Sequence, residues 1–324
     1  MTVPEAAIAF HALGLDDHGP AVVAIGGGHG LAAALQAIQC YAGEITAVVS
    51  VGDDGGSSGR LKSGLGIPPP GDIRRCLLAL SPEPSIWWEL FAYRFEEADV
   101  EGHSLGNLML AALTDLLSDF ESAVRRAGDL LGAVGVVVPA AAQATHLEAV
   151  VGGRTVRGQV AISQARGGVE KLTVGPKGVR ATPRAMEAIT EADQIVLGPG
   201  SLFTSVLAVL LVPGIAEAVA AAGAAKVFVL NLITQDGETL GLSGPDHIGA
   251  LAGLAGLTGP GAIVAHRGAL EVPEGLDRVT LEPEEAARLG WRMLEEDVAD
   301  QIAAWPQHDP MKLGRALQGL SGTM

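Results

Sequence analysis

Two glycine-rich loops near the start of the chain carry its clearest chemical signal. Residues 24–31 (AIGGGHGL) follow the apolar run 21–25, and residues 53–59 (DDGGSSG) follow the apolar run 45–51. Glycine lets backbone N–H groups approach a phosphate closely, and a following helix directs the positive end of its dipole to the same point. The carboxylates and hydroxyls of the second loop could hold ribose, a metal ion or a sugar. The pair predicts a nucleotide or nucleotide-sugar site.

The acidic pair in the second loop leaves more than one interpretation open. Asp53 and Asp54 could accept hydrogen bonds from ribose hydroxyls, bind a hard cation such as Mg²⁺, or act as a base. Aspartate is also common in turns beside glycine. We favour a functional role for Asp53, which is nearer to the strand, and leave both roles open for Asp54. Ser57 and Ser58 are candidate phosphate donors.

Two later segments also place polar groups at predicted helix starts. In residues 70–75 (PGDIRR), Asp72 is predicted to cap a helix, and Arg74 or Arg75 could reach a phosphate. In residues 103–107 (HSLGN), Ser104 is either an N-cap or a nucleophile. It lacks the G-x-S-x-G frame of a strained nucleophile elbow. Binding of phosphate or sugar is therefore favoured over covalent catalysis.

Two further strand ends complete the candidate site. Residues 198–205 (GPGSLFTS) form a third candidate anion nest, and Asn231 and Thr234 suit recognition of a base or sugar. The predicted ligand-binding residues are Gly27, Gly28, His29, Gly30, Leu31, Asp53, Asp54, Ser57, Ser58, Gly71, Asp72, Arg74, His103, Ser104, Asn107, Gly200, Ser201, Thr204, Asn231 and Thr234.

The elements that must position these residues read as a doubly wound α/β fold, with a mostly parallel Rossmann-like sheet and helices on both faces. Continuous apolar runs predict buried parallel strands, and capped periodic segments between them predict helices. The carboxyl ends of such strands share one edge, where ligands bind. The predicted strands are 21–25, 45–50, 134–138, 194–197 and 225–230; the predicted helices include 31–41, 72–80, 86–95, 120–131 and 183–191.

Other segments define the domain organisation. Residues 52–71 are predicted as a long loop, with seven glycines and three consecutive prolines. Residues 145–151 and 155–162 alternate polar and apolar side chains around two glycines, which predicts a β-hairpin. It would belong to a small β-rich insertion at about 144–180. We predict an N-terminal extension, 1–19, and a single domain, 20–320.

Composition excludes several classes of function. The net charge of −16 disfavours nucleic acid, whose backbone requires clustered Lys and Arg. Cys40 and Cys76 are predicted to be buried thiols, and no metal-spaced cluster is evident. Residues 1–19 lack a basic leader region and no apolar run is long enough to span a bilayer, so we predict a cytoplasmic protein. No lysine has the spacing of a Walker P-loop. Leu31 occupies a position where the dinucleotide fingerprint of a dehydrogenase needs a small residue.

The combined loops resemble the YvcK (GlmR) family of gluconeogenesis factors. The resemblance covers roughly residues 20–320 and is carried by residues 26–31 (GGGHGL), 53–61 (DDGGSSGRL), 69–74 (PPGDIR), 102–108 (GHSLGNL), 198–205 (GPGSLFTS) and 231–239 (NLITQDGET). Two positions depart from the family pattern: His29 stands where the family has Thr, and Gln307 where it has Arg before His-Asp. Both departures bear on affinity for the ligand or on its choice.

The resemblance implies a fold shared with CofD-like 2-phospho-L-lactate transferases and binding of UDP-N-acetylglucosamine or another UDP-sugar. It further implies a regulator of carbon flow into peptidoglycan precursors and of cell shape during gluconeogenic growth, acting through a protein partner in amino-sugar or cell-wall synthesis. No cofactor is required in this reading, and a homo-oligomer is compatible with it. The alternative is a Mg²⁺-dependent transferase that uses Asp53 or Asp54.

Overall fold

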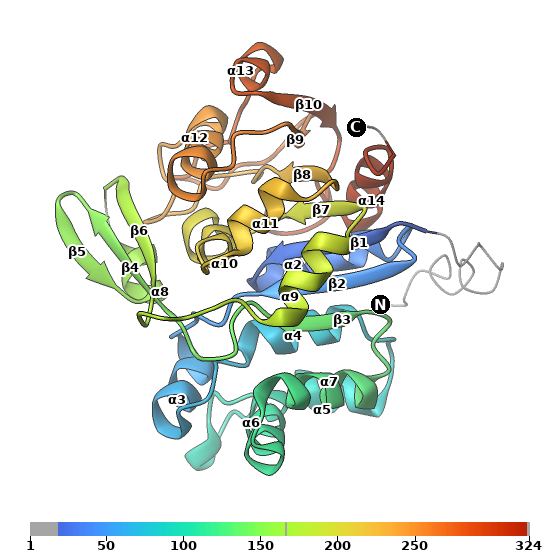
Figure 1. The fold of residues 1–324 in the computed structure, drawn as a ribbon, viewed down its shortest axis with the longest axis vertical. Helices are drawn as coiled ribbons and strands as arrows, with labels where there is room; N and C mark the ends of the chain where they lie inside the picture. The colour runs from blue at the N-terminus through green and yellow to red at the C-terminus, as the bar shows by residue number, and fades with distance from the viewer. Residues whose placement is uncertain (1–18, 166, 323–324) are drawn as a thin grey trace.

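The computed structural model describes residues 19–165 and 167–322, and its centre is a seven-stranded sheet (Figure 1). The strand order is β10-β9-β8-β7-β1-β2-β3, and every neighbouring pair is parallel. The order reverses between β1 and β7, which confirms the doubly wound fold. The strands are β1 Ala21–Gly26, β2 Glu44–Val49, β3 Val136–Pro139, β7 Gln194–Leu197, β8 Ala225–Val229, β9 Gly261–His266 and β10 Trp291–Glu296.

The central strands are buried because helices cover both faces of the sheet. Figure 1 shows α9, α10 and α11 in front of the sheet and α2 behind it, where α2 packs against α4 and α14. The helices around the sheet include α2 Gly28–Ile38, α4 Gly71–Ala79, α5 Ile86–Ala92, α6 Leu105–Leu117, α7 Phe120–Leu131, α9 Pro183–Glu191, α10 Leu207–Leu210, α11 Ile215–Ala221, α12 Gly244–Ala255, α13 Pro283–Arg288 and α14 Pro310–Gln318. Short helical turns also occur at η1 Ala98–Val100 and η2 Leu202–Val206.

The insertion is a separate three-stranded antiparallel sheet, seen at the left of Figure 1. It consists of β4 His146–Val151, β5 Arg154–Arg157 and β6 Val169–Gly175, in the order β5-β4-β6. The predicted hairpin around Gly152 and Gly153 is confirmed. Its second strand was predicted to reach residue 162, which is wrong: β5 ends at Arg157, and α8, Gln159–Gln164, follows. The chain turns there at Gly158, whose φ is +99°.

The prediction of a continuous loop over residues 52–71 is wrong, because this segment contains α3, Gly56–Leu65. The helix buries only Ser57, Ser58 and Leu61, and therefore shows no apolar periodicity in sequence. It ends at Gly66 in the left-handed conformation, a common helix terminator. Helix α2 likewise starts at Gly28, three residues before the predicted start, so the first glycine loop is also a helix start.

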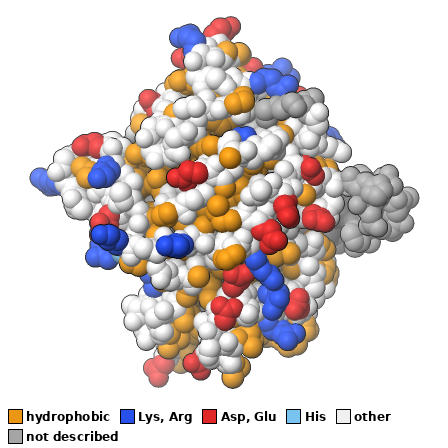
Figure 2. All heavy atoms as spheres, in the orientation of Figure 1, with side chains coloured by type: hydrophobic (Ala, Val, Ile, Leu, Met, Phe, Trp, Pro, Cys, Tyr) orange, Lys and Arg blue, Asp and Glu red, His pale blue; other side chains and the backbone are white. Residues whose placement is uncertain are grey.

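Cys76 is buried in α4 as predicted, whereas the prediction for Cys40 is wrong. Cys40 lies just past the end of α2, is only half-buried, and has its Sγ 3.7 Å from Met311 Sδ. Across the described ranges, no single helix is long and apolar enough to cross a membrane; Leu202–Leu210 and Ile215–Ala221 meet those criteria only as a pair bent by 77°. On the face in Figure 2, acidic and basic side chains are interspersed. The predicted extension, apart from Gly19, lies outside the described residues.

Candidate functional site

The loops that follow β1, β2 and β7 meet at the carboxyl edge of the sheet. Gly30 lies directly against the carbonyl of Pro199, where a Cβ would overlap it. A Cβ on Gly27 would stand 2.5 Å from Asp72 Oδ2 and 3.5 Å from Ser205 Oγ. The first loop therefore touches both the third loop and the start of α4. A Cβ at position 30 would meet backbone atoms, and a Cβ at position 27 would displace the Asp72 carboxyl group.

Asp72 and Asp53 form the acidic centre of this edge. Asp72 is 5% exposed and carries a raised pKa of about 6, chiefly because burial disfavours the charged form, with the Asp53 carboxylate adding to the effect. Arg75, whose nitrogen lies 3.2 Å from Asp72 Oδ1, and the N–H of Gly28 act in the opposite direction. The predicted cap is wrong: Pro70 is the N-cap, and Asp72 lies inside the first turn, turned toward Gly27 and Gly28.

Asp54 is directed away from this pair and anchors the insertion. Its Oδ1 accepts a hydrogen bond from the N–H of Val160 at 3.0 Å, in the first turn of α8, and its carboxylate also lies against Gly158. Asp53 and Asp54 are adjacent in sequence, but their side chains thus contact different partners. In the described part of the chain, no three His, Cys, Asp or Glu side chains are arranged to hold a metal ion. A cation at this edge would be held by Asp53 and Asp72.

A chain of four side chains links α4, α6 and α3. Arg74 Nε donates to Asn107 Oδ1 at 3.2 Å, Asn107 Nδ2 donates to Ser57 Oγ at 3.1 Å, and Ser57 Oγ lies 2.9 Å from His103 Nδ1. Arg74 is buried and also donates to the carbonyl of Phe91. The Arg74 guanidinium therefore contacts other groups of the protein, and the phosphate contact predicted for it stays a prediction.

Ser104 and Ser58 are buried beside this chain. Ser104 is fully buried and accepts a hydrogen bond from the N–H of Asn107 at 3.3 Å, which confirms it as the N-cap of α6. Ser58 is 4% exposed, and its Oγ lies against Gly71. Ser58 thus joins α3 to the start of α4, so the second loop and residue 71 are adjacent, as the prediction of one shared edge requires.

The third loop already holds an acidic side chain, the carboxyl group of Glu238. Glu238 Oε1 accepts hydrogen bonds from the N–H groups of Phe203 at 2.8 Å and Thr204 at 3.0 Å, and the hydroxyl of Thr204 donates to the same carboxylate. Burial raises the pKa of Glu238, while these donors and Ser201 favour its charged form. Sequence reasoning missed Glu238 because the contact spans more than thirty residues. The predicted anion nest exists, and the protein's own side chain fills it.

Three other predicted residues make internal contacts. Asn231 Oδ1 lies 3.4 Å from the N–H of Gly200, so it joins the third loop to the loop that follows β8, which is the fourth loop. Thr234 is fully buried, and its hydroxyl accepts a hydrogen bond from the N–H of Asp277 at 2.9 Å. Leu31 is fully buried in the core beneath the first loop. Their predicted contacts with a ligand stay predictions.

Basic side chains surround the same edge in this acidic protein. Partial burial lowers the pKa of His29, which lies at this edge, and the guanidinium groups of Arg75 and Arg74 lower it further. Burial likewise lowers the pKa of His103, with contributions from Arg60 and Arg94. The arginines beside these two histidines give this edge of the protein positive charge, which favours an anion.

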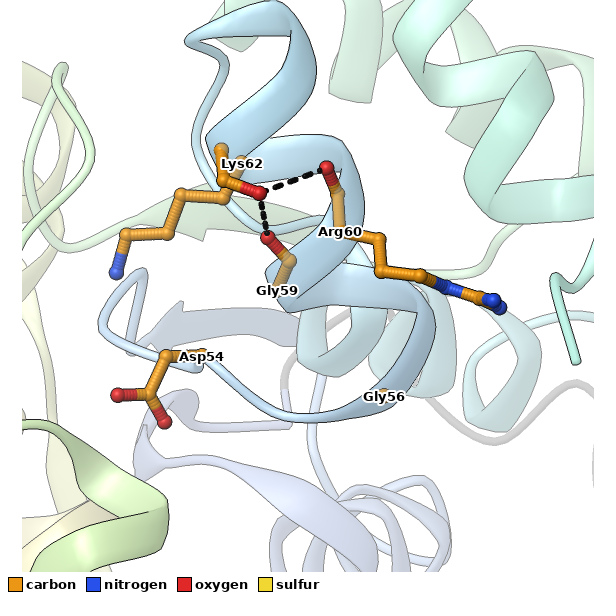
Figure 3. A pocket seen from close by; sticks show the side chains of 6 residues that line it. Asp54, Gly56, Gly59, Arg60 and Lys62 are labelled. Carbon is orange, nitrogen blue, oxygen red and sulfur yellow. Dashed lines mark hydrogen bonds between the residues drawn. The ribbon is translucent and has the colours of Figure 1, made fainter.

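A cavity of about 800 Å³ opens beside α3 (Figure 3). The Lys62 and Asp54 side chains extend to one side of the helix, and Arg60 extends to the other. Lys62 Nζ donates to the carbonyl of Thr145 at 2.7 Å, at the start of the insertion. The cavity is lined by Asp54, Gly56, Gly59, Arg60, Lys62 and Ser63.

Helix α8 of the insertion lies between the second and fourth loops. Its first turn is anchored by Asp54, and its last turn lies against Gly237, which contacts the carbonyl of Ser163. Gly237 precedes Glu238, whose carboxylate holds the third loop. Because β1 and β7 lie between β2 and β8 in the sheet, α8 connects loops on either side of the first and third glycine loops. The insertion is thus part of the site's wall.

Comparison with known proteins identifies the class to which this fold and site belong. Residues 22–299 match the family model described as 2-phospho-L-lactate transferase CofD. A crystal structure of a UPF0052 family member from Bacillus halodurans superposes with a TM-score of 0.89 at 36% identity, covering 93% of this chain and 99% of that one. The chain belongs to the CofD family.

Relatives of this chain include gluconeogenesis factors, as the loop motifs predicted. The gluconeogenesis factor of Bacillus subtilis is 44% identical over 234 residues, which cover 72% of this chain and 74% of the relative. That of Halalkalibacterium halodurans is 44% identical over 232 residues, covering 71% and 72% respectively.

Proposed function

We propose that the protein binds a UDP-sugar, with UDP-N-acetylglucosamine as the first candidate, at the carboxyl edge of its parallel sheet. The observation that carries this proposal is that two glycine-rich helix starts, those of α2 and α3, both lie against the start of α4, near the arginines around His29 and His103. Free N–H groups at a helix start favour phosphate oxygens. The diphosphate would lie on the amides of the first loop, and Asp53 would accept hydrogen bonds from ribose or uracil.

The regulatory half of the proposal comes from the relatives. Proteins 44% identical to this chain are named gluconeogenesis factors. We infer a cytoplasmic sensor that, when loaded with UDP-sugar, alters a protein partner in amino-sugar or cell-wall synthesis and so directs carbon into peptidoglycan precursors and influences cell shape. Helix α8 offers a route for the signal, because it contacts loops on both sides of the proposed diphosphate position.

Isothermal titration calorimetry tests the binding step. UDP-N-acetylglucosamine should bind more tightly than GDP-mannose or NADH, and Asp53→Ala should weaken it at least tenfold without changing the thermal midpoint of the free protein. Asp115→Ala, a change at an exposed carboxylate on α6, is the matched control. Absence of both heat and thermal shift at millimolar UDP-sugar would remove the proposal.

Asp53 and Asp72 support a second candidate function, a Mg²⁺-dependent CofD-like transferase. Asp53 and Asp72 lie close enough for one to raise the pKa of the other, and carboxylate oxygens are preferred ligands of Mg²⁺. A bound cation would supply charge stabilisation to a transferring phosphoryl group. Turnover of a diphosphate substrate that is lost in Asp72→Asn would favour this function, whereas ligand binding without turnover would count against it.

A further inference from the structure

The hydrogen-bond chain that ends at His103 has a defined direction from Arg74 through Asn107 to Ser57. An arginine guanidinium can only donate, so Asn107 must present its oxygen to Arg74 Nε, 3.2 Å away. The amide nitrogen of Asn107 is then the donor to Ser57 Oγ at 3.1 Å. Because the Asn107 NH2 group cannot accept a hydrogen bond, the Ser57 hydroxyl proton is left free for the other partner of Ser57, His103 Nδ1, which lies at 2.9 Å. The buried arginine therefore fixes Asn107 as a donor to Ser57 and leaves His103 Nδ1 as the acceptor within reach of the serine proton.

Transfer of the Ser57 proton requires one state of the imidazole. His103 Nδ1 accepts that proton in the neutral tautomer that carries its hydrogen on Nε2. The lowered pKa of His103, caused by burial and by Arg60 and Arg94, keeps the ring neutral near pH 7. A serine within hydrogen-bond reach of a neutral imidazole has the nucleophile and base of an activated pair, and here the third group, Asn107, orients the serine.

The surroundings suit a phosphoryl group more than an acyl group. Ser57 is the second residue of α3, where helix N–H groups lack helical partners and favour negative charge. Arg60 and Arg94 donate to the carbonyls of Glu101 and Gly102, and both guanidinium groups lie near enough to lower the pKa of His103. Negative charge developing on phosphoryl oxygens next to Ser57 would meet these groups.

We propose that Ser57 is a nucleophile and His103 its general base, and that the pair accepts a phosphoryl group from a phosphoric anhydride. Ser57 Oγ forms a bond to phosphorus, the bond from phosphorus to the leaving oxygen breaks, and the serine proton passes to His103 Nδ1. The leaving oxygen takes the electron pair of the broken bond and the proton from Nε2, which leaves phosphoserine and a neutral imidazole. Arg74 and Asn107 act as positioning residues. The proposal does not depend on UDP-sugar binding.

Labelling with diisopropyl fluorophosphate tests the pair directly, because serine attack on that reagent expels fluoride. Intact mass and peptide mapping should show one diisopropylphosphoryl group on Ser57, added at least ten times faster than to Ser63. Ser63 is an internal reference on the same helix, exposed and hydrogen-bonded only to the carbonyls of Gly59 and Arg60. No label on Ser57, or labelling no faster than at Ser63, overturns the proposal.

Two substitutions of His103 separate catalysis from structural support. Glutamine retains an acceptor oxygen for the Ser57 hydroxyl but cannot take up its proton, whereas alanine removes both properties. Both His103→Gln and His103→Ala should lower the labelling rate of Ser57 about 100-fold, the usual contribution of a general base. If His103→Gln reacts at the rate of the unaltered protein, the histidine is structural and the proposal fails. Thermal unfolding of each variant establishes that the labelled species is folded.

Discussion

The buried carboxyl of Asp72 makes the stability of the folded protein depend on pH in the opposite direction from most aspartates. Its pKa is about 6 in the folded protein, against 3.8 when unperturbed. Between these values the unfolded chain has lost the proton and the folded protein retains it. Unfolding therefore releases a proton, and the free energy of unfolding falls as pH rises through this window. Asp72→Asn removes this dependence.

The size of the effect follows from the shift. A rise from 3.8 to about 6, at about 1.4 kcal/mol for each pKa unit, corresponds to about 3 kcal/mol. Asp72 is 5% exposed, so solvent screening reduces this figure little. The stability of Asp72→Asn relative to the unaltered protein should therefore increase by about 3 kcal/mol between pH 4 and pH 7, and stay level above it. The Arg75 ion pair is already included, because it contributes to the folded pKa.

Urea unfolding at a series of pH values measures this difference, with fluorescence and circular dichroism compared to establish a single transition. Taking the difference between the two proteins cancels every other titrating group. Asp115→Asn, on the exposed face of α6, is the matched control for replacing one carboxylate by an amide. A flat difference for Asp72→Asn, or one that falls with rising pH, would refute the assignment of Asp72 as a carboxyl destabilised by burial.

Three further predictions concern the same edge. Glu238→Ala leaves two buried backbone N–H groups without an acceptor and should lower the free energy of unfolding by about 1–3 kcal/mol in urea, whereas Glu238→Gln should lower it less. Gly27→Ala places a Cβ 2.5 Å from Asp72 Oδ2 and should destabilise the protein more than Gly28→Ala, whose open position at φ +69° costs about 1–2 kcal/mol; equal losses would contradict the packing described. Burial lowers the pKa of His308 from 6.5 to about 4, so the unfolded chain binds a proton first and stability should fall by up to about 3 kcal/mol as pH drops through that range. A stability difference between the unaltered protein and His308→Gln that does not vary over this range would oppose the last prediction.

The parallel sheet was predictable because its strands are buried on both faces and therefore read as unbroken apolar runs. Residues 194–197, 120–131 and 183–191 were predicted with the same bounds that the structure has. Both helices begin after a side-chain cap, Asp119 or Thr182, so their starts are encoded locally. Helix α3 lacked such signals, since it is rich in glycine and serine and buries one apolar side chain.

The loops that form the site were predictable, but the partner of each side chain was not. Asp53 and Asp54 are adjacent in sequence and yet face α4 and α8, because Asp53 lies against Gly71 and the insertion folds back onto Asp54. The contact of Ser57 with His103 spans 46 residues, and Glu238 reaches Thr204 across 34. Such contacts depend on which loops the sheet order brings together, and local residue types do not encode them.

The seven-stranded sheet consists of two halves, each continuous in sequence, that meet where β1 pairs with β7. Residues 21–139 provide β1 to β3 and the first two glycine loops, while residues 194–296 provide β7 to β10 and the loops that contain Thr204 and Glu238. The insertion lies between them in sequence, with its exposed hairpin turn at Gly152 and Gly153. A chain severed at that turn would leave each fragment with an unpaired parallel edge, and only their reassembly along β1 and β7 would rebuild the crevice. Ligand binding could then serve as a reporter of fragment association.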